Sequence, residues 1–283
     1  SIASPELKAQ RIDVLNYWSR NKEGIVIVPI SGLKKIIPPK ALWVEQQFNL
    51  KVGEDIDVEK QLVRFVDMGY NRAEMVSSPG EFSVRGGIID IYPLTESDPI
   101  RIELFDTEIE SIRSFSLEDQ RSRNKLSEIT IGPATETPLL EEHYEKVASK
   151  VEAGLARSLK KIKDDKTKTL LTQNISIELE QLRNKQKPEQ LFKYLSFAYD
   201  ESNSLVDYLP ENALILVDEI SRVQEMNDSL EKEEAEWYTS LLGEGKIIHD
   251  VLISHQIQSM VQKAKRSMVY MSLFLRHVPN TNP

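Results

Sequence analysis

The alternation of apolar and polar residues over residues 80–116 constrains the fold of this chain more than any other feature. A period of two is typical of β-strands that bury one face and expose the other. Gly86 and Gly87 predict a bend or bulge, and residues 105–108 predict a turn between two strands. Sequential strands with short turns indicate an antiparallel meander. The strands are expected near residues 81–92, 100–105, 108–116 and 127–131.

A helix should cover one face of this meander. Residues 57–68 carry apolar side chains at helical spacing, and Gly69 is expected to end the helix. Helix and strands together predict a β-rich α+β module over residues 51–135.

The flanking segments have the pattern of an α/β layer. Ser4 and Pro5 have the residue types of a helix start, at the N-cap and the first helical position. Residues 25–28 and 214–217 are continuous apolar runs, which predict buried parallel strands of one sheet. Because the chain opens on a helix without an initiator Met, we expect further sequence upstream.

The predicted fold class is therefore α/β, with one α/β domain interrupted by the β-rich module. Its parts are expected at residues 1–50 and 136–283, around the module at 51–135. The second part should begin with a helical arm over residues 141–185. A further strand is expected at 246–253, an apolar segment at 267–275 and a linker at 279–283.

Composition excludes several classes of function. The 283 residues contain no cysteine, which removes disulfides and thiolate zinc sites and fits a reducing, cytoplasmic location. No apolar run approaches the ~20 residues of a membrane span, so no membrane partner is expected. The net charge of −9 argues against autonomous nucleic-acid binding. The lysine-rich segment 160–168 is a solvated face or helix break, with a DNA phosphate contact as the alternative.

Asp218 and Glu219 end an apolar run, as in the Walker B strand of a P-loop ATPase. Such an enzyme also needs a Gly-x-x-x-x-Gly-Lys loop to hold the phosphates, and no glycine of this sequence begins one. We therefore expect a degenerate Walker B strand, no catalytic residue, no metal site and no cofactor in this chain.

Residues 80–93 and 100–109 resemble the module shared by the excision-repair subunit UvrB and the bacterial transcription-repair coupling factors. Residues 207–219 resemble the UvrB stretch that ends in its helicase box, but Ile220 and Ser221 stand where that family has Ser-His. Residues 68–76, 79–93 and 110–122 are more similar to the coupling factors, and no tyrosine-rich hairpin of the UvrB type is visible.

The resemblance implies a degenerate RecA-like, helicase-like domain that has lost nucleotide chemistry and carries a module that binds UvrA. The UvrA-contacting positions of the family match Arg85, Arg101 and Phe105. It also implies a longer parent protein that binds stalled RNA polymerase and double-stranded DNA, with a translocase that uses ATP and Mg²⁺ outside this chain.

Arginines on rigid strands suit an acidic partner, since the guanidinium binds carboxylates in a bidentate manner. An aromatic side chain beside arginines is typical of an interface hot spot. Period two places Phe105 on the same strand face as Arg101, although Phe105 could instead pack in the core. Two other functions stay open: a UvrB-type ATPase or helicase fragment using Asp218 and Glu219, and a clamp on the parent's own motor.

Overall fold

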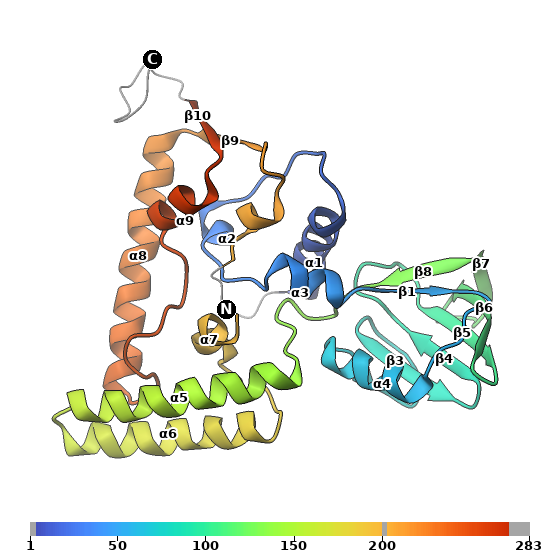
Figure 1. Cartoon of the computed structure of the whole chain (residues 1–283), viewed down its shortest axis with the longest axis horizontal. Coiled ribbons are helices and arrows are strands. Elements are labelled where there is room, and N and C mark those ends of the chain that lie inside the picture. Colours follow the sequence, from blue (N-terminus) through green and yellow to red (C-terminus); the bar gives the residue numbers. More distant parts are fainter. Residues whose placement is uncertain (1–3, 200–202, 272–283) are drawn as a thin grey trace. The chain divides into compact units, whose positions relative to one another are not determined.

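The computed structural model describes residues 4–199 and 203–271 (Figure 1). Contacts between residues divide the chain into two compact units. The first comprises Ser1–Gly24 and Pro38–Leu140 and is here called the sheet unit. The second comprises Ile25–Ile37 and Glu141–Pro283 and is called the helical unit. Both units contain helices and strands, so the protein belongs to the mixed α and β class.

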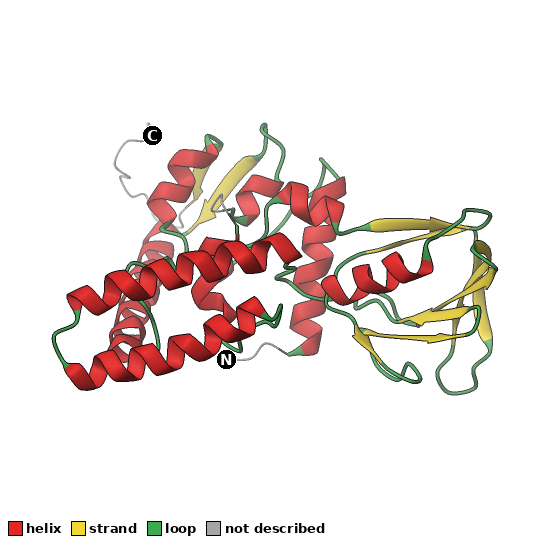
Figure 2. Cartoon of the chain, turned by 60° about the horizontal axis from the view of Figure 1, so that its bottom comes forward, coloured by secondary structure: helices red, strands yellow, loops and turns green. Residues whose placement is uncertain are grey.

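A six-stranded sheet forms the centre of the sheet unit (Figures 1 and 2). Its strands follow the chain order from β2 to β7, and neighbours from β3 onward are antiparallel. The predicted antiparallel meander is confirmed for residues 81–116, but the strand predicted near 127–131 is β8 (Glu128–Ile131), which pairs with β1 (Phe48–Lys51) outside this sheet. The sequence pattern missed the two edge strands, β2, which runs parallel to β3, and β7. The strands are β2 Asn71–Arg72, β3 Glu81–Arg85, β4 Ile88–Ile91, β5 Ile100–Phe105, β6 Glu108–Phe115 and β7 Ser122–Leu126.

Helix α4 (Val58–Asp67) covers one face of this sheet, as predicted. The Asp57 carboxylate caps the helix by accepting the Lys60 N–H at 3.3 Å, and Gly69 follows the helix with a φ of +94°. Phe65 and Met68 are completely buried against the strands. A two-stranded antiparallel pair closes the same core, formed by β1 (Phe48–Lys51) and β8 (Glu128–Ile131).

Helices α1 (Pro5–Arg20) and α3 (Lys40–Glu45) complete the sheet unit. Helix α1 begins as predicted, because the Ser4 hydroxyl accepts the Leu7 N–H at 3.2 Å. Leu7 is 42% exposed, and the buried face of the helix begins at Ile12. Helix α3 was not expected. Its Trp43 is completely buried and donates its indole N–H to Asn16 at 3.0 Å, which joins the two helices.

A helical hairpin opens the second part of the helical unit. Helices α5 (Glu141–Lys161) and α6 (Asp165–Arg183) pack along their buried apolar stripes, which confirms the helical arm. The lysine-rich segment contains the predicted helix break, and Asp164 caps α6 by accepting the Thr167 N–H at 3.2 Å. Short elements in the same unit are α2 Ile30–Leu33, η1 Leu191–Tyr194, α7 Leu195–Ala198 and η2 Leu205–Tyr208.

The helical unit ends in a strand–helix–strand arrangement. Strand β9 (Leu214–Asp218) leads into α8 (Ile220–Gly243), and after α9 (Ile257–Ala264) the chain forms β10 (Ser267–Met271). Strands β9 and β10 are hydrogen-bonded in parallel, as a crossover connection requires. Of the helices in residues 4–199 and 203–271, none combines the length and apolarity needed to cross a bilayer.

The strand predicted at residues 25–28 is wrong. These residues have no regular secondary structure, and Ile25 and Ile27 are 91% and 92% exposed. Strand β9 pairs with β10, so the prediction that residues 25–28 and 214–217 share a sheet is also wrong. An apolar run forms a strand only when another strand satisfies its backbone hydrogen bonds, and no strand among the described residues pairs with residues 25–28.

Two predictions about the C-terminal part also fail. Strand β9 forms but is not buried, because Leu214 and Leu216 are each 57% exposed on a sheet of two strands. Residues 246–253 form no strand. Ile247 and Ile248 are nevertheless completely buried, and the His249 N–H is held by the Ser158 hydroxyl at 2.8 Å.

An apolar segment was expected at residues 267–275. Its first part forms β10 (Ser267–Met271), and residues 272–275 lie outside the described residues. The linker expected at 279–283 also lies outside them. The grouping by contacts assigns Ser1–Gly24 to the sheet unit, whereas the sequence assigned residues 1–50 to the interrupted α/β domain. The division into 1–50, 51–135 and 136–283 stays a prediction.

Candidate partner-binding site

The six-stranded sheet has one face in the core and one face turned away from it. Alternate side chains of β3, β4 and β5, such as Phe82, Ile89 and Ile102, belong to the buried core. The opposite side chains form what is here called the outer face. It carries Ser83, Arg85, Ile88, Asp90, Arg101, Glu103, Phe105 and Arg113.

The strand register places the three predicted contact residues on this outer face. Arg85 pairs with Ile88, and Ile88 pairs with Glu103, which lies midway between Arg101 and Phe105 on β5. With strands ~4.8 Å apart and a rise of ~3.3 Å per residue, the three Cα atoms are roughly 12 Å from one another. One partner surface of modest size can therefore contact all three.

Two hairpin turns determine this arrangement. Gly86 and Gly87 form the two-residue turn between β3 and β4, with a φ of +58° at Gly86, rather than a bulge. A Cβ atom on Gly87 would lie 2.8 Å from the Leu104 carbonyl oxygen, so this position needs glycine. The turn predicted at residues 105–108 is confirmed by the pairing of Phe105 with Glu108.

Phe105 lies at the end of β5 and is 74% exposed. Its neighbours Ile102 and Leu104 pack with the core, so β5 keeps the period of two through its whole length. The alternative in which Phe105 fills the core is wrong. An isolated, largely exposed phenylalanine on a rigid strand can insert into an apolar pocket of a partner.

Arg85 is exposed at the end of β3, next to the Gly86–Gly87 turn. In the part of the chain that the structure describes, its guanidinium forms no hydrogen bond and no ion pair. All of its donors are therefore open to a carboxylate of another molecule.

Arg101 is in a different situation, since it is already paired. Its Nε lies 2.8 Å from Oδ1 of Asp90 and its Nη2 lies 2.9 Å from Oδ2. The guanidinium carbon lies 4.3 Å from the centre of the Phe115 ring, and Nη2 also donates to Gln120 Oε1 at 3.2 Å. The hydrogen bond that Arg101 donates to Asp90 raises the pKa of Arg101, so the guanidinium stays charged.

Sequence reasoning missed Asp90, Phe115 and Gln120 as parts of this site. A signal was available for Asp90, because a carboxylate interrupts the apolar run of β4 at a position that the register places opposite Arg101. Gln120 has a φ of +59°, an uncommon conformation for a residue with a side chain, and it lies in the connection between β6 and β7. Nothing in the sequence pattern indicated its contact with Arg101.

Asp218 and Glu219 occupy the predicted position at the end of a strand, before α8. Asp218 is exposed, and Glu219 has a left-handed backbone with a φ of +53°. Among the described residues, no group of three histidine, cysteine or acidic side chains is arranged to hold a metal ion. The pair lies at the expected strand end.

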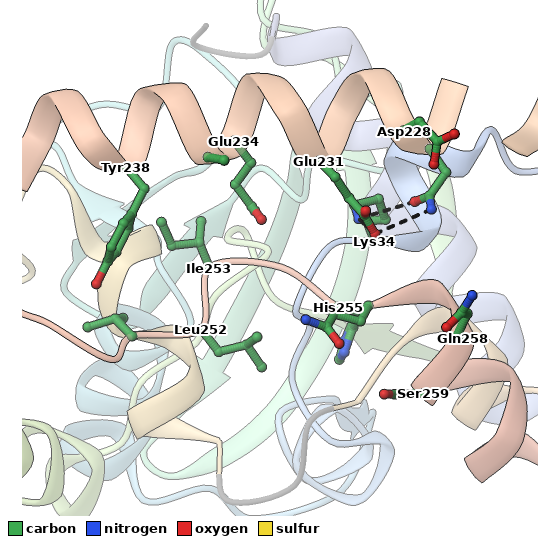
Figure 3. A pocket seen from close by; sticks show the side chains of 14 residues that line it. Lys34, Asp228, Glu231, Glu234, Tyr238, Leu252, Ile253, His255, Gln258 and Ser259 are labelled. Carbon is green, nitrogen blue, oxygen red and sulfur yellow. Dashed lines mark hydrogen bonds and ion pairs between the residues drawn. The ribbon is translucent and has the colours of Figure 1, made fainter. Parts of the chain in front are cut away.

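A hollow of about 590 Å³ lies in the helical unit, between α8 and residues 251–259 (Figure 3). Three of its polar side chains contact one another. Lys34 donates to Asn227 at 3.3 Å and lies 4.0 Å from a Glu231 oxygen, as the dashed lines mark. His255 Nε2 lies 2.8 Å from the Asn203 carbonyl oxygen, and burial lowers the pKa of this imidazole. These contacts join residues of the helical unit that are far apart in the sequence.

The UvrB interaction domain family matches residues 48–136. This range begins with β1, ends after β8 and contains the whole six-stranded sheet together with Arg85, Arg101 and Phe105. The part of the chain that contains the sheet is therefore similar to the UvrB interaction domain.

Relatives match the rest of the chain as well. The chain is 50% identical over all of its 283 residues to the transcription-repair-coupling factor of Bacillus subtilis, of which it covers 24%. It is 36% identical over 282 residues to the factor of Staphylococcus aureus, again covering 24% of that protein. It is 38% identical over 246 residues, 87% of the chain, to the factor of Staphylococcus haemolyticus, of which it covers 21%.

The chain therefore spans about a quarter of the length of the curated relatives it matches. Its similarity to them extends over the helical unit, beyond the UvrB interaction domain. This confirms the resemblance to the UvrB-like region of the coupling factors.

Proposed function

We propose that this chain is the part of a transcription-repair-coupling factor that binds UvrA through the outer face of its six-stranded sheet. The observation that carries the proposal is the exposed pair of Arg85 and Phe105 on one face of the UvrB interaction domain. Binding would recruit nucleotide-excision repair to RNA polymerase stalled at a DNA lesion.

The chemistry of the outer face supports a protein partner. Arginine and aromatic side chains dominate interface hot spots, and here they stand on strands that hold them in fixed positions. The unpaired guanidinium of Arg85 favours an acidic surface, and Phe105 favours an apolar pocket beside it. Because Arg85 is exposed to solvent, its attraction to a carboxylate should weaken as salt is added.

The other partners belong to a larger protein in this proposal. The chain's net charge is −9, which does not favour binding to DNA phosphates by the chain itself. We therefore assign the contacts with RNA polymerase and double-stranded DNA, and the ATP-driven translocase, to sequence outside these 283 residues. The absence of cysteine fits a cytoplasmic location.

We propose that the chain itself hydrolyses no ATP and uses no cofactor. The sequence has no phosphate-binding loop, and Ile220 and Ser221 replace the Ser-His of the helicase box. The parallel pairing of β9 with β10 around α8 supports a RecA-like origin for this part. ATP turnover that disappears in Asp218→Ala would contradict this assignment and favour the ATPase alternative.

The proposal is tested by titrating purified UvrA with this chain. We expect the wild type to bind UvrA with a micromolar or lower dissociation constant. Arg85→Ala should raise this constant about thirtyfold. Arg183→Ala is the matched control, because Arg183 is an exposed arginine on α6 in the helical unit. The absence of wild-type binding, or equal losses in both variants, would contradict the proposal.

A further inference from the structure

The two arginines of the outer face differ in a way that bears on how a partner is recognised. The guanidinium of Arg85 forms no hydrogen bond within the described residues. Arg101, by contrast, donates hydrogen bonds from Nε and Nη2 to the two carboxylate oxygens of Asp90. The side chains of Arg101 and Asp90 are only 13% and 4% exposed. The inference drawn from this difference rests on the proposed function.

The surroundings of Arg101 fix the plane of its guanidinium. Asp90 holds one edge in a bidentate contact, and the buried Phe115 ring lies beneath the group at 4.3 Å. Gln120 accepts a further bond from Nη2 at 3.2 Å, and its own amide donates to the Leu117 carbonyl oxygen at 3.3 Å. The side chain is thus ordered before a partner arrives, which removes most of the entropy cost of using it.

The pairing also changes the charge that a partner meets. Arg101 and Asp90 together are neutral, and Asp90 has little contact with water that could be lost on binding. Nη1 forms no hydrogen bond to any residue that the structure describes, so its two N–H groups are still available. A second carboxylate at Nη1 would leave one uncompensated negative charge in a poorly solvated place, which is unfavourable. A neutral oxygen acceptor has no such cost.

We propose that Asp90 is a positioning residue, which presents Nη1 of Arg101 to a neutral acceptor of the partner. This acceptor is a backbone carbonyl or side-chain amide oxygen. The partner's carboxylate binds Arg85 instead. Arg85 then supplies the salt-dependent part of binding, and Arg101 supplies a directional contact that is insensitive to salt.

A simpler role for Asp90 is to brace Arg101 over Phe115 for stability alone. Binding measured on the folded variant separates the two roles, because loss of a purely structural brace lowers the melting temperature and leaves the affinity of the folded protein for UvrA unchanged. The measurement is the dissociation constant for UvrA at several salt concentrations, with thermal unfolding recorded for each variant.

Asp90→Asn is the decisive variant, because it removes the carboxylate charge with almost no change in size. We expect UvrA affinity at physiological salt to fall about tenfold and to depend more steeply on salt, since Arg101 becomes an uncompensated cation. Arg85→Gln should flatten the salt dependence instead. Affinity equal to or tighter than wild type in Asp90→Asn, or a loss with unchanged salt dependence, would overturn the proposal.

A second variant covers the case in which Asp90→Asn does not fold. The double replacement Asp90→Leu with Arg101→Met exchanges the ion pair for apolar groups, which proteins often tolerate without loss of stability. It should fold, bind UvrA about tenfold more weakly and keep the wild-type salt dependence. Wild-type affinity in this variant would overturn the proposal.

Phe105→Ala separates this inference from the proposed function. One outcome is that the wild type binds UvrA, Phe105→Ala weakens this binding and both Asp90 variants bind with wild-type affinity. The positioning role of Asp90 is then wrong, and the proposed function stands. If the wild type does not bind UvrA, the proposed function fails and the positioning role fails with it.

Discussion

The guanidinium of Arg101 and the carboxylate of Asp90 form a bidentate ion pair across β4 and β5, with contacts of 2.8 Å and 2.9 Å. The pair lies on the face of the sheet that carries Arg85 and Phe105. Of the three predicted contact residues, Arg101 is therefore held in place within the sheet, whereas Arg85 and Phe105 are exposed. This division determines which substitutions report on binding and which report on the fold.

Phe105→Ala should weaken UvrA binding without destabilising the chain. Phe105 is 74% exposed, so its removal leaves no cavity, whereas a hot-spot truncation costs ~2 kcal/mol of binding, or a factor of roughly thirty. Ile102→Ala is the control on the same strand. Its side chain is completely buried, and the loss should be about 2–5 kcal/mol of unfolding free energy. An equal decrease in melting temperature in Phe105→Ala and Ile102→Ala would contradict this prediction.

Gly87→Ala should destabilise the sheet unit by about 1–3 kcal/mol, because the new Cβ would press on the Leu104 carbonyl oxygen at 2.8 Å. The strain lies between the strands that carry Arg85 and Phe105, so UvrA binding should weaken as well. Gly86→Asn is the matched control, since asparagine tolerates a φ of +58° and no atom lies within 4 Å of the added Cβ. Urea unfolding of both variants checks the prediction, and similar midpoints would refute it.

Glu178→Ala should destabilise the helical unit strongly. Glu178 lies 2.8 Å from Nζ of Lys193, whose side chain is 2% exposed, and burial lowers the pKa of this lysine. Removing the carboxylate leaves a buried ammonium without its partner, at a cost of about 3–5 kcal/mol. Glu152→Ala breaks the exposed pair with Arg183 and should cost under ~1 kcal/mol. Denaturant unfolding compares them, and equal losses would contradict the account.

Acid should destabilise the helical unit through His255. Burial lowers the pKa of this imidazole below 6.5, an effect that Lys263 and Lys34 reinforce and that Asn203 and Asp207 oppose. The unfolded chain therefore binds the proton more readily, so the free energy of unfolding falls as the pH drops through and below 6.5. Well above 6.5 the imidazole is neutral in both states and has no effect.

His255→Gln supplies the control for this pH dependence, since glutamine can still donate to the Asn203 carbonyl and does not titrate. Between pH ~7 and ~5, urea midpoints should fall less in the variant than in the wild type. If the urea midpoints of the two proteins fall equally, groups other than His255 cause the acid sensitivity.

The sheet unit could largely be predicted from the sequence, because a period of two specifies both the strands and the face that each side chain occupies. That reasoning placed Arg101 and Phe105 on one face, and β5 confirms it. The ion pair between Arg101 and Asp90 could not be predicted in the same way. It depends on the register between β4 and β5, which is set by the connection between the two strands.

The helical unit was harder to predict from apolar runs. Residues 25–28 and 214–217 have similar composition, yet only the second forms a strand, because β10 provides its hydrogen-bonding partner. Ile247 and Ile248 are apolar because they are buried, without any strand. An apolar run indicates burial, and it predicts a strand only where the fold supplies a neighbouring strand.

The most direct test of the central claim is the affinity of UvrA for the double variant Arg85→Ala, Phe105→Ala. Both side chains are exposed, so the variant should unfold at the wild-type temperature. Its affinity for UvrA should fall by roughly two to three orders of magnitude, if the two losses of ~2 kcal/mol combine. Wild-type affinity in the folded double variant would show that UvrA does not bind the outer face of this sheet.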